Sequence, residues 1–171
     1  MFNTHKNKNG FSLLETVIFI GISVFLIAII TSLLIVYVRA YVTFSAASRI
    51  NTAALGSGDR ITREIKLTTS VNVAASTFGT HPGNLVLNTN PGGVPTVIEF
   101  YLEGTTLKIK RDGVVVGALT GSNVDINKLI FWHTSLGSAQ IVSYEMDIVT
   151  SAGSSTRSAT FLTSSSIRGA Y

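Results

Sequence analysis

The chain has 171 residues, of which 46% are hydrophobic and only 13% are charged, with 13 basic against 9 acidic side chains and no cysteine. An ordinary soluble domain carries about a quarter charged residues, so these totals exclude disorder and indicate one domain plus an unusually apolar segment. The lack of cysteine excludes disulfides, thiolate metal sites and a cysteine nucleophile. The net charge of +4 comes from scattered residues and does not by itself indicate nucleic-acid binding.

The first long element is an apolar stretch from Thr16 to Val38 that contains no charged residue. Its length of about 23 residues exceeds the roughly 20 that a helix needs to cross a bilayer core. About 16 of these residues are Val, Ile, Leu or Phe, which together favour insertion by on the order of 5 to 10 kcal/mol. Glu15 at the edge would oppose insertion by at most about 3 kcal/mol. We therefore expect a helix that spans a membrane.

A cleaved secretory signal is the alternative interpretation of this N-terminus. The apolar region of such a signal is about 7 to 15 residues long and ends at a small-residue cleavage site. Here the apolar stretch is longer and continues into Arg39-Ala40-Tyr41. The two lysines before the stretch nearly balance the two arginines that follow it, so the positive-inside rule gives only a slight preference for a cytoplasmic N-terminus.

The residues before the apolar stretch form the motif Gly10-Phe11-Ser12-Leu13-Leu14-Glu15, preceded by a short polar leader with two lysines. A leader that ends in Gly, then Phe, then an acid four residues on and an uninterrupted apolar helix, resembles the class III signal of type IV prepilins and pseudopilins. The resemblance implies that a prepilin peptidase cleaves between Gly10 and Phe11 and methylates the new N-terminus at Phe11. Gly10 suits this role, because a residue without Cβ lets a protease approach the backbone closely.

The same resemblance gives Glu15 a task in assembly. A carboxylate buried among apolar helices is costly unless it is paired, and the α-amino group of Phe11 on a neighbouring subunit is its implied partner. The other interpretation is an acid near the membrane interface that interacts with the positive end of its own helix. The chain departs from the family at Thr16, a position that is more often apolar.

After the apolar stretch, apolar residues recur at spacings of three and four, which predicts an amphipathic helical extension over residues 39–70. Gly56-Ser57-Gly58 is expected to break or hinge this extension. Asp59 can then cap a second helical stretch with Ile61 and Ile65 on one face. The charged residues of this stretch are expected to face solvent: Arg60, Arg63, Glu64 and Lys66.

Residues 71–171 are strand-rich and contain no helical pattern. The segment VIEFYLEGTTLKIKRDGVVVGALTG predicts two successive hairpins that turn near Gly104 and at Asp112-Gly113. Further strands are expected at residues 85–87, 129–133, 140–149 and 157–164. A long transmembrane and amphipathic helix followed by an antiparallel β-sheet is an α+β fold class. This order of elements resembles pilins, and in particular the longer minor pseudopilins of the J type.

Candidate catalytic and metal-binding residues are sparse. His81 and His133 are isolated, without the H-x-x-H spacing of a metal site, and no serine lies in a G-x-S-x-G elbow. Glu145 and Asp147 share one strand face, but no loop supplies the six or more oxygen ligands that calcium takes. We therefore expect no enzyme activity, no cofactor and no metal. Trp132 is expected to be a core aromatic residue rather than an exposed contact for another subunit.

One cluster of basic residues favours a different class of function, the binding of DNA. Lys108 and Lys110 share a strand face and Arg111 follows them. Tyr101 is expected on the neighbouring strand, so together they offer a surface that could contact DNA phosphates. The alternative interpretation is an ordinary solvated sheet face with acidic neighbours.

We expect a structural subunit, of the minor kind, of a type IV pilus or type II secretion pseudopilus. The implied partners are prepilin peptidase, other pilin or pseudopilin subunits, the inner-membrane assembly platform and membrane lipid. The implied location is the bacterial cytoplasmic membrane, with a single crossing and the C-terminal domain outside, and then the filament. The alternative is a single-pass membrane protein whose β-domain binds DNA or a secreted substrate without polymerising.

Overall fold

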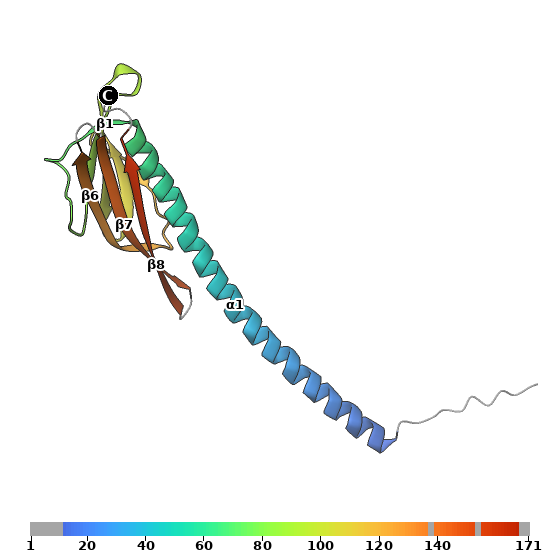
Figure 1. Ribbon diagram of the computed structural model, residues 1–171. Helices are drawn as coiled ribbons and strands as arrows, with labels where there is room; N and C mark the ends of the chain where they lie inside the picture. The colour runs from blue at the N-terminus through green and yellow to red at the C-terminus, as the bar shows by residue number, and fades with distance from the viewer. Residues whose placement is uncertain (1–11, 137–138, 153–154, 168–171) are drawn as a thin grey trace, which may run out of the picture. The chain divides into compact units, whose positions relative to one another are not determined.

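The computed structural model describes residues 12–136, 139–152 and 155–167, and one long helix is followed there by eight strands (Figure 1). The helix, α1, runs from Leu13 to Leu67. All strand pairs are antiparallel. The predicted α+β fold class, a long helix followed by antiparallel β-structure, is therefore confirmed.

The chain divides into two compact units, residues 1–41 and residues 42–171. In the second unit one face of α1 is buried at a spacing of three to four residues, as expected for an amphipathic helix. The buried residues are Ala46, Ile50, Ala54, Ser57, Ile61, Glu64 and Ile65.

Glu64 is the unexpected member of this buried face, because the sequence pattern predicted that it would point into solvent. Only 5% of Glu64 is exposed, and its carboxylate lies 2.8 Å from the guanidinium of Arg60, four residues earlier. The prediction is wrong for a physical reason: a cation one helical turn away compensates the buried charge.

The predicted hinge at Gly56-Ser57-Gly58 is also absent, since α1 runs through these residues without a break. The fully buried Ser57 hydroxyl donates to the Ala53 carbonyl at 2.6 Å. Gly58 lies against Tyr144, whose hydroxyl donates to the Gly58 carbonyl at 3.3 Å. A Cβ at position 58 would lie only 3.0 Å from the Tyr144 oxygen. The glycine thus permits a close approach of a strand to the helix rather than a turn.

Five strands form one sheet in the order β1-β2-β3-β4-β5. Their bounds are β1 Thr68–Val71, β2 Leu85–Thr89, β3 Thr96–Glu103, β4 Thr106–Arg111 and β5 Val114–Ala118, with a short 3-10 helix, η1, at Pro91–Gly93. The two predicted hairpin turns are confirmed. Gly104, Asp112 and Gly113 have positive φ angles of 62°, 50° and 78°, which glycine and aspartate adopt more readily than other residues.

The last three strands form a second sheet in the order β6-β7-β8. Their bounds are β6 Asp125–Leu136, β7 Ala139–Ala152 and β8 Ser155–Ser166. The free edge of β6 is covered by the loop that precedes β2. In this loop Gly79 N–H donates to the Phe131 carbonyl at 2.9 Å, and Gly83 N–H donates to the Leu129 carbonyl at 2.8 Å.

One hydrophobic core joins α1 and both sheets within the second unit. It includes fully buried side chains from each of them, among them Ile61 of α1, Phe100 of β3, Phe131 of β6 and Tyr144 of β7. The predicted alternation on β7 is confirmed, because every second residue is buried: Val142, Tyr144, Met146 and Ile148. The opposite face of the β6-β7-β8 sheet, called the outer face below, points away from this core.

Candidate functional site

The N-terminal end of α1 is stabilised by local hydrogen bonds. Leu14 N–H donates to the Ser12 hydroxyl at 3.3 Å, a contact that caps the helix. The Thr16 hydroxyl donates to the carbonyls of Ser12 and Leu13 at 3.2 and 3.0 Å. Thr16 is therefore satisfied within the helix, which suits a polar residue in an apolar segment. Glu15 is exposed in the first turn, where the positive end of the helix dipole favours a carboxylate.

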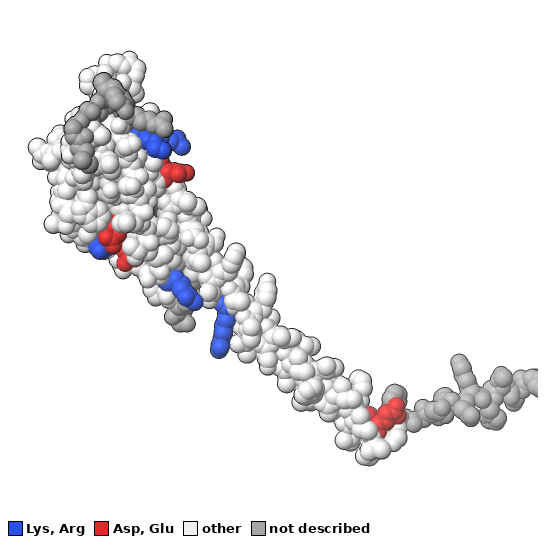
Figure 2. Space-filling view, in the orientation of Figure 1, with Lys and Arg blue, Asp and Glu red and all other residues white. Residues whose placement is uncertain are grey.

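From Val17 to Val38 the helix presents large apolar side chains that lack any cover. Their exposed fractions run from 41% at Ile29 to 72% at Phe19. The hydroxyls of Thr31 and Ser32 each donate to the carbonyl four residues earlier at 2.9 Å. No charged side chain interrupts this surface (Figure 2). By length and composition α1 could cross a membrane, and its most apolar window is not buried by the rest of the described chain.

The two residues assigned to processing, Gly10 and Phe11, lie outside the described residues. Glu15, assigned to assembly, is the first acid of α1, followed by the uncharged surface described above. The described part of the motif thus consists of a capped helix start, an exposed carboxylate and an exposed apolar surface.

The predicted basic surface does form, on β3 and β4. Tyr101 and Lys108 are cross-strand partners, and Lys110 Nζ lies 3.9 Å from the centroid of the Tyr101 ring. Arg111 is exposed at the end of β4. These side chains are therefore neighbours in space, as the sequence pattern indicated.

Two carboxylates of β3 lie against two of these cations. Lys108 Nζ donates to Glu103, and this hydrogen bond raises the pKa of Lys108 above its usual value of 10.5. Lys110 Nζ lies 3.3 Å from a Glu99 carboxylate oxygen. Pairing of this kind reduces the positive potential that a phosphate backbone would meet. The two acids lie four residues apart on β3, on the same face as Tyr101, and only the strand register shows which lysine each of them meets.

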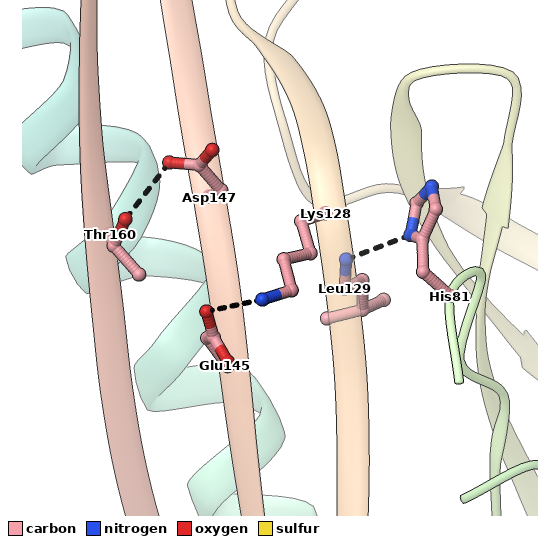
Figure 3. A network of polar contacts seen from close by, with 6 residues as sticks. All are labelled: His81, Lys128, Leu129, Glu145, Asp147 and Thr160. Atoms are coloured by element: carbon pink, nitrogen blue, oxygen red, sulfur yellow. Dashed lines mark hydrogen bonds and ion pairs between the residues drawn. The ribbon is translucent and has the colours of Figure 1, made fainter. Parts of the chain in front are cut away.

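A polar network crosses the outer face of β6-β7-β8 (Figure 3). Lys128 Nζ donates to Glu145 at 2.8 Å, and the Thr160 hydroxyl donates to Asp147 at 3.1 Å. Glu145 and Asp147 were considered above as calcium ligands, and both are occupied by partners from the neighbouring strands. Among the described residues no group of three His, Asp or Glu side chains is placed to hold a metal ion.

Of the two described histidines, His81 lies in the loop before β2 and His133 lies in β6, the strand whose edge this loop covers. His81 Nδ1 accepts from the Leu129 N–H at 3.1 Å (Figure 3). The His133 ring lies 5.7 Å from the ring of Phe78. Both contacts fasten the loop to the sheet edge, so each ring has a structural role.

Trp132 is a residue whose environment the sequence analysis predicted wrongly. It is 37% exposed on the outer face of β6, while its neighbour Phe131 is fully buried. The strand is apolar on both faces, since Leu129 is buried and Ile130 is half-buried on the side of Trp132. Strand alternation alone therefore could not decide which of two adjacent aromatic residues enters the core.

Comparison with known proteins gives no relative for this chain. No protein-family model matches it, and neither does any curated protein or solved structure. What the fold establishes is a pilin-like architecture, in which one long apolar N-terminal helix capable of crossing a membrane precedes antiparallel sheets.

Proposed function

We propose that this chain is a minor structural subunit of a type IV pilus or type II secretion pseudopilus. A prepilin peptidase would process it between Gly10 and Phe11, and it would assemble through the N-terminal part of α1. The observation that carries this proposal is the uncovered apolar surface from Val17 to Val38.

Such a surface requires a partner, because each large apolar side chain gains about 1.5 to 3 kcal/mol when it is removed from water. Membrane lipid supplies that cover for a single helix, and equivalent helices of neighbouring subunits supply it in a bundle. The core of the second unit is filled by its own residues from position 50 onwards. The apolar part of α1 is therefore available for contacts outside the chain.

Glu15 supports assembly rather than simple anchoring. In a simple anchor Glu15 would gain only the small stabilisation that the positive end of its own helix gives, whereas the carboxylate is costly once neighbouring helices cover it without a partner. Removal of a leader at Gly10 would create a charged α-amino group on Phe11, four residues before Glu15 in the chain. A neighbouring subunit could then pair its amino group with Glu15 and fix the axial register of the helices.

The proposed location is the cytoplasmic membrane of a bacterium, with the β-rich unit outside. The slight positive-inside preference of the leader supports this orientation, and so does the cytoplasmic site of cleavage that the motif implies. After assembly the β-rich unit would lie on the outside of the filament.

The direct test is the mass and N-terminal sequence of the protein recovered from its native membranes. We expect a chain that begins at Phe11, has 161 residues (171 minus the 10 of the leader) and carries one additional methyl group. A Gly10→Val variant serves as the control and should keep its leader. Recovery of the wild-type chain with an intact start at Met1 would contradict the proposal and favour the non-polymerising membrane anchor.

A second test separates assembly from anchoring through Glu15. We expect Glu15→Ala and Glu15→Gln to be cleaved and inserted normally, but to reach sheared filaments at least about tenfold less than wild type, because the buried amino group loses its partner. Thr16→Val is the matched control, since it changes the adjacent residue and keeps the acid. Immunoblots of the sheared and membrane fractions give the readout. Normal incorporation of Glu15→Ala would overturn the pairing role.

A further inference from the structure

Strand β8 is an outermost strand of the β6-β7-β8 sheet, and only its edge towards β7 is paired (Figure 1). The two strands form an antiparallel ladder, at the end of which the Ile167 N–H donates to the Gln140 carbonyl at 3.0 Å. In such a ladder every second residue directs its N–H and C=O groups at the partner strand. Counted back from Ile167, the even-numbered residues of β8 therefore direct these groups away from β7. They are Thr156, Ser158, Thr160, Leu162, Ser164 and Ser166.

This second edge of β8 is open in the part of the chain that the structure describes. The six even-numbered residues are exposed, and none of the backbone hydrogen bonds described outside the ladders engages them. The edge also lacks the usual protection against pairing, since β8 has no proline, no bulge and Arg157 as its one charged residue. An open and regular strand edge is a template for pairing with another extended chain.

Two hollows lie along the seam between this edge and α1, on the core side of the sheet. One is lined by α1 residues between 43 and 51 and by β8 at Ala159. The other is lined by α1 residues between 54 and 62 and by β8 at Phe161. Every second side chain of a strand beside β8 would point to this seam. Leu55, which is 68% exposed and borders the second hollow, favours apolar side chains there.

The direction of α1 argues against the same edge of a second copy as the partner. The helix and β8 run parallel, because residues 43–51 lie beside residues 157–159 and residues 54–62 lie beside Phe161 and Thr163. A closed two-fold contact would pair two β8 strands antiparallel, so the two packed α1 segments would also run in opposite directions. Insertion of both N-terminal ends into one membrane, which the proposed function requires, does not allow this arrangement.

The edge strands of the five-stranded sheet do not match β8 either. β1 and β5 are four and five residues long, and each has an irregular register with its neighbouring strand. Short and irregular edges hinder pairing. The twelve-residue edge of β8 therefore suits a strand that this chain does not supply.

We propose that β8 receives an extended segment of a different protein as a fourth, antiparallel strand of the β6-β7-β8 sheet. The segment has apolar side chains at the alternate positions that face the seam, where the hollows select them, while main-chain hydrogen bonds to β8 supply affinity. It is uncharged, because the hollows contain one charged residue each, Arg157 and Asp59, which are opposite in sign. The choice of a different protein rests on the proposed function, whereas the strand addition does not.

Peptide binding to the full-length chain in detergent tests the strand addition. The probe is the fluorescein-labelled heptapeptide TVTVTVT, with two matched versions that are N-methylated at the threonines or at the valines. With the valines in the seam, an antiparallel strand directs its threonine N–H groups at β8 and its valine N–H groups away. We expect saturable fluorescence anisotropy with the parent and the valine-methylated peptide, and at least about fivefold weaker binding of the threonine-methylated one. Equal binding of the two methylated peptides, or no saturable binding of the parent, would overturn the proposal.

Proline variants locate the binding edge. The N–H groups of Leu162 and Ser164 point away from β7, so proline at either position removes no bond of the ladder, and edge strands tolerate such prolines. We expect Leu162→Pro and Ser164→Pro each to weaken binding of the parent peptide at least about fivefold, and Leu162→Ala, the matched control, to change it less than about twofold. Thermal unfolding identifies the variants that keep the fold. Binding at the wild-type level by a folded proline variant would contradict the proposal.

Cross-linking in native membranes separates a different protein from a second copy. The chain has no cysteine, so Leu162→Cys introduces a single thiol at the open edge. We expect a short bismaleimide to give no homodimer of this variant, and a homodimer would overturn the choice of partner. Peptide binding by a chain with an intact start at Met1 would refute the proposed function alone. A chain that begins at Phe11 and binds no peptide would refute the strand addition alone.

Discussion

The two parts of α1 differ in what surrounds them although they share one secondary structure. Between Leu13 and Tyr41 none of the large apolar side chains is buried, whereas between Val42 and Leu67 a regular face of the helix is buried in the core. Helix formation in the second part is stabilised by packing within the chain. In the first part it depends on lipid or on other helices, since propensity alone gives little stability. The difference separates the part of the helix that packs within the protein from the part that the rest of the described chain leaves uncovered.

The largest expected effect is a loss of stability, and it is tested by truncating one isoleucine in each part of α1. Ile61→Ala should lower the free energy of unfolding of the β-rich unit by about 2 to 5 kcal/mol, because Ile61 is fully buried and its truncation leaves a cavity. Ile27→Ala should change it by less than about 0.5 kcal/mol, because Ile27 is 63% exposed. Urea unfolding of the full chain in detergent, followed by Trp132 fluorescence, measures both. Similar losses of unfolding free energy for the two variants would contradict the difference between the two parts of α1.

A smaller effect is expected from the ion pair on the buried face of α1. Arg60→Met should lower the free energy of unfolding by about 1 to 3 kcal/mol, because it leaves the Glu64 carboxylate buried without its cation. Arg63→Met is the control, since Arg63 is exposed on the same helix and its change should stay within about 0.5 kcal/mol. Equal losses of unfolding free energy for the two variants in the same urea experiment would show that Arg60 does not stabilise the buried Glu64 carboxylate.

The glycines of α1 test the same difference between the uncovered and the packed part of the helix. A Cβ meets nothing within 4 Å at Gly21 or Gly56 but lies 3.0 Å from the Tyr144 oxygen at Gly58. Gly56→Ala should therefore stabilise the β-rich unit by about 0.5 to 1 kcal/mol through helix propensity. Gly58→Ala should destabilise it by about 1 kcal/mol through crowding, and Gly21→Ala should leave it unchanged. Thermal unfolding of the three variants checks the order, and a stabilising Gly58→Ala would contradict the close contact.

The features that the sequence predicted well depend on local signals. The apolar stretch from Thr16 to Val38 needs only composition and length to indicate a membrane helix. The turns at Gly104 and Asp112-Gly113 need only a residue that accepts positive φ between two alternating segments. Each signal lies within a few residues of the structure that it specifies, so no knowledge of distant contacts was required.

The features that were missed depend on residues far away in the chain. Gly56 and Gly58, with only Ser57 between them, indicated a hinge, but Tyr144, 86 residues after Gly58, makes glycine the residue that fits at position 58. Trp132 and Phe131 are both large aromatics on one strand, and only the position of the core decides between their faces. The division into two sheets likewise depends on strand pairing that alternation does not encode.

For the candidate sites, the sequence predicted which residues would gather but not their partners. Lys108, Lys110 and Tyr101 do lie together on adjoining strands. Acidic neighbours of the cations were expected, Glu103 among them, but the pairing of Lys108 with Glu103 and of Lys110 with Glu99 became evident only with the cross-strand register. The sequence therefore shows which charged residues lie on a sheet face, but the pairing of the strands decides which of these charges neutralise one another.

The smallest expected effect concerns the ion pair of Lys108 with Glu103, in which the carboxylate is exposed, unlike that of Glu64 on α1. The hydrogen bond from Lys108 to Glu103 raises the pKa of Lys108 above 10.5. A raised pKa means that the pair stabilises the fold fully below pH 10.5 and that this contribution disappears as the pH rises through the higher value. Glu103→Gln should bring the pKa of Lys108 back towards 10.5, as measured by NMR titration of its side-chain nitrogen.

Salt distinguishes this pair from the one on the helix. Because Glu103 is exposed and Lys108 is only half-buried, raising the ionic strength to about 1 M should remove most of the pKa difference between wild type and Glu103→Gln. The destabilisation caused by Arg60→Met should persist at the same ionic strength, because Glu64 is buried and screened less. An exposed pair that resisted salt would mean that burial does not govern the charge pairs of this protein as it governs the two parts of α1.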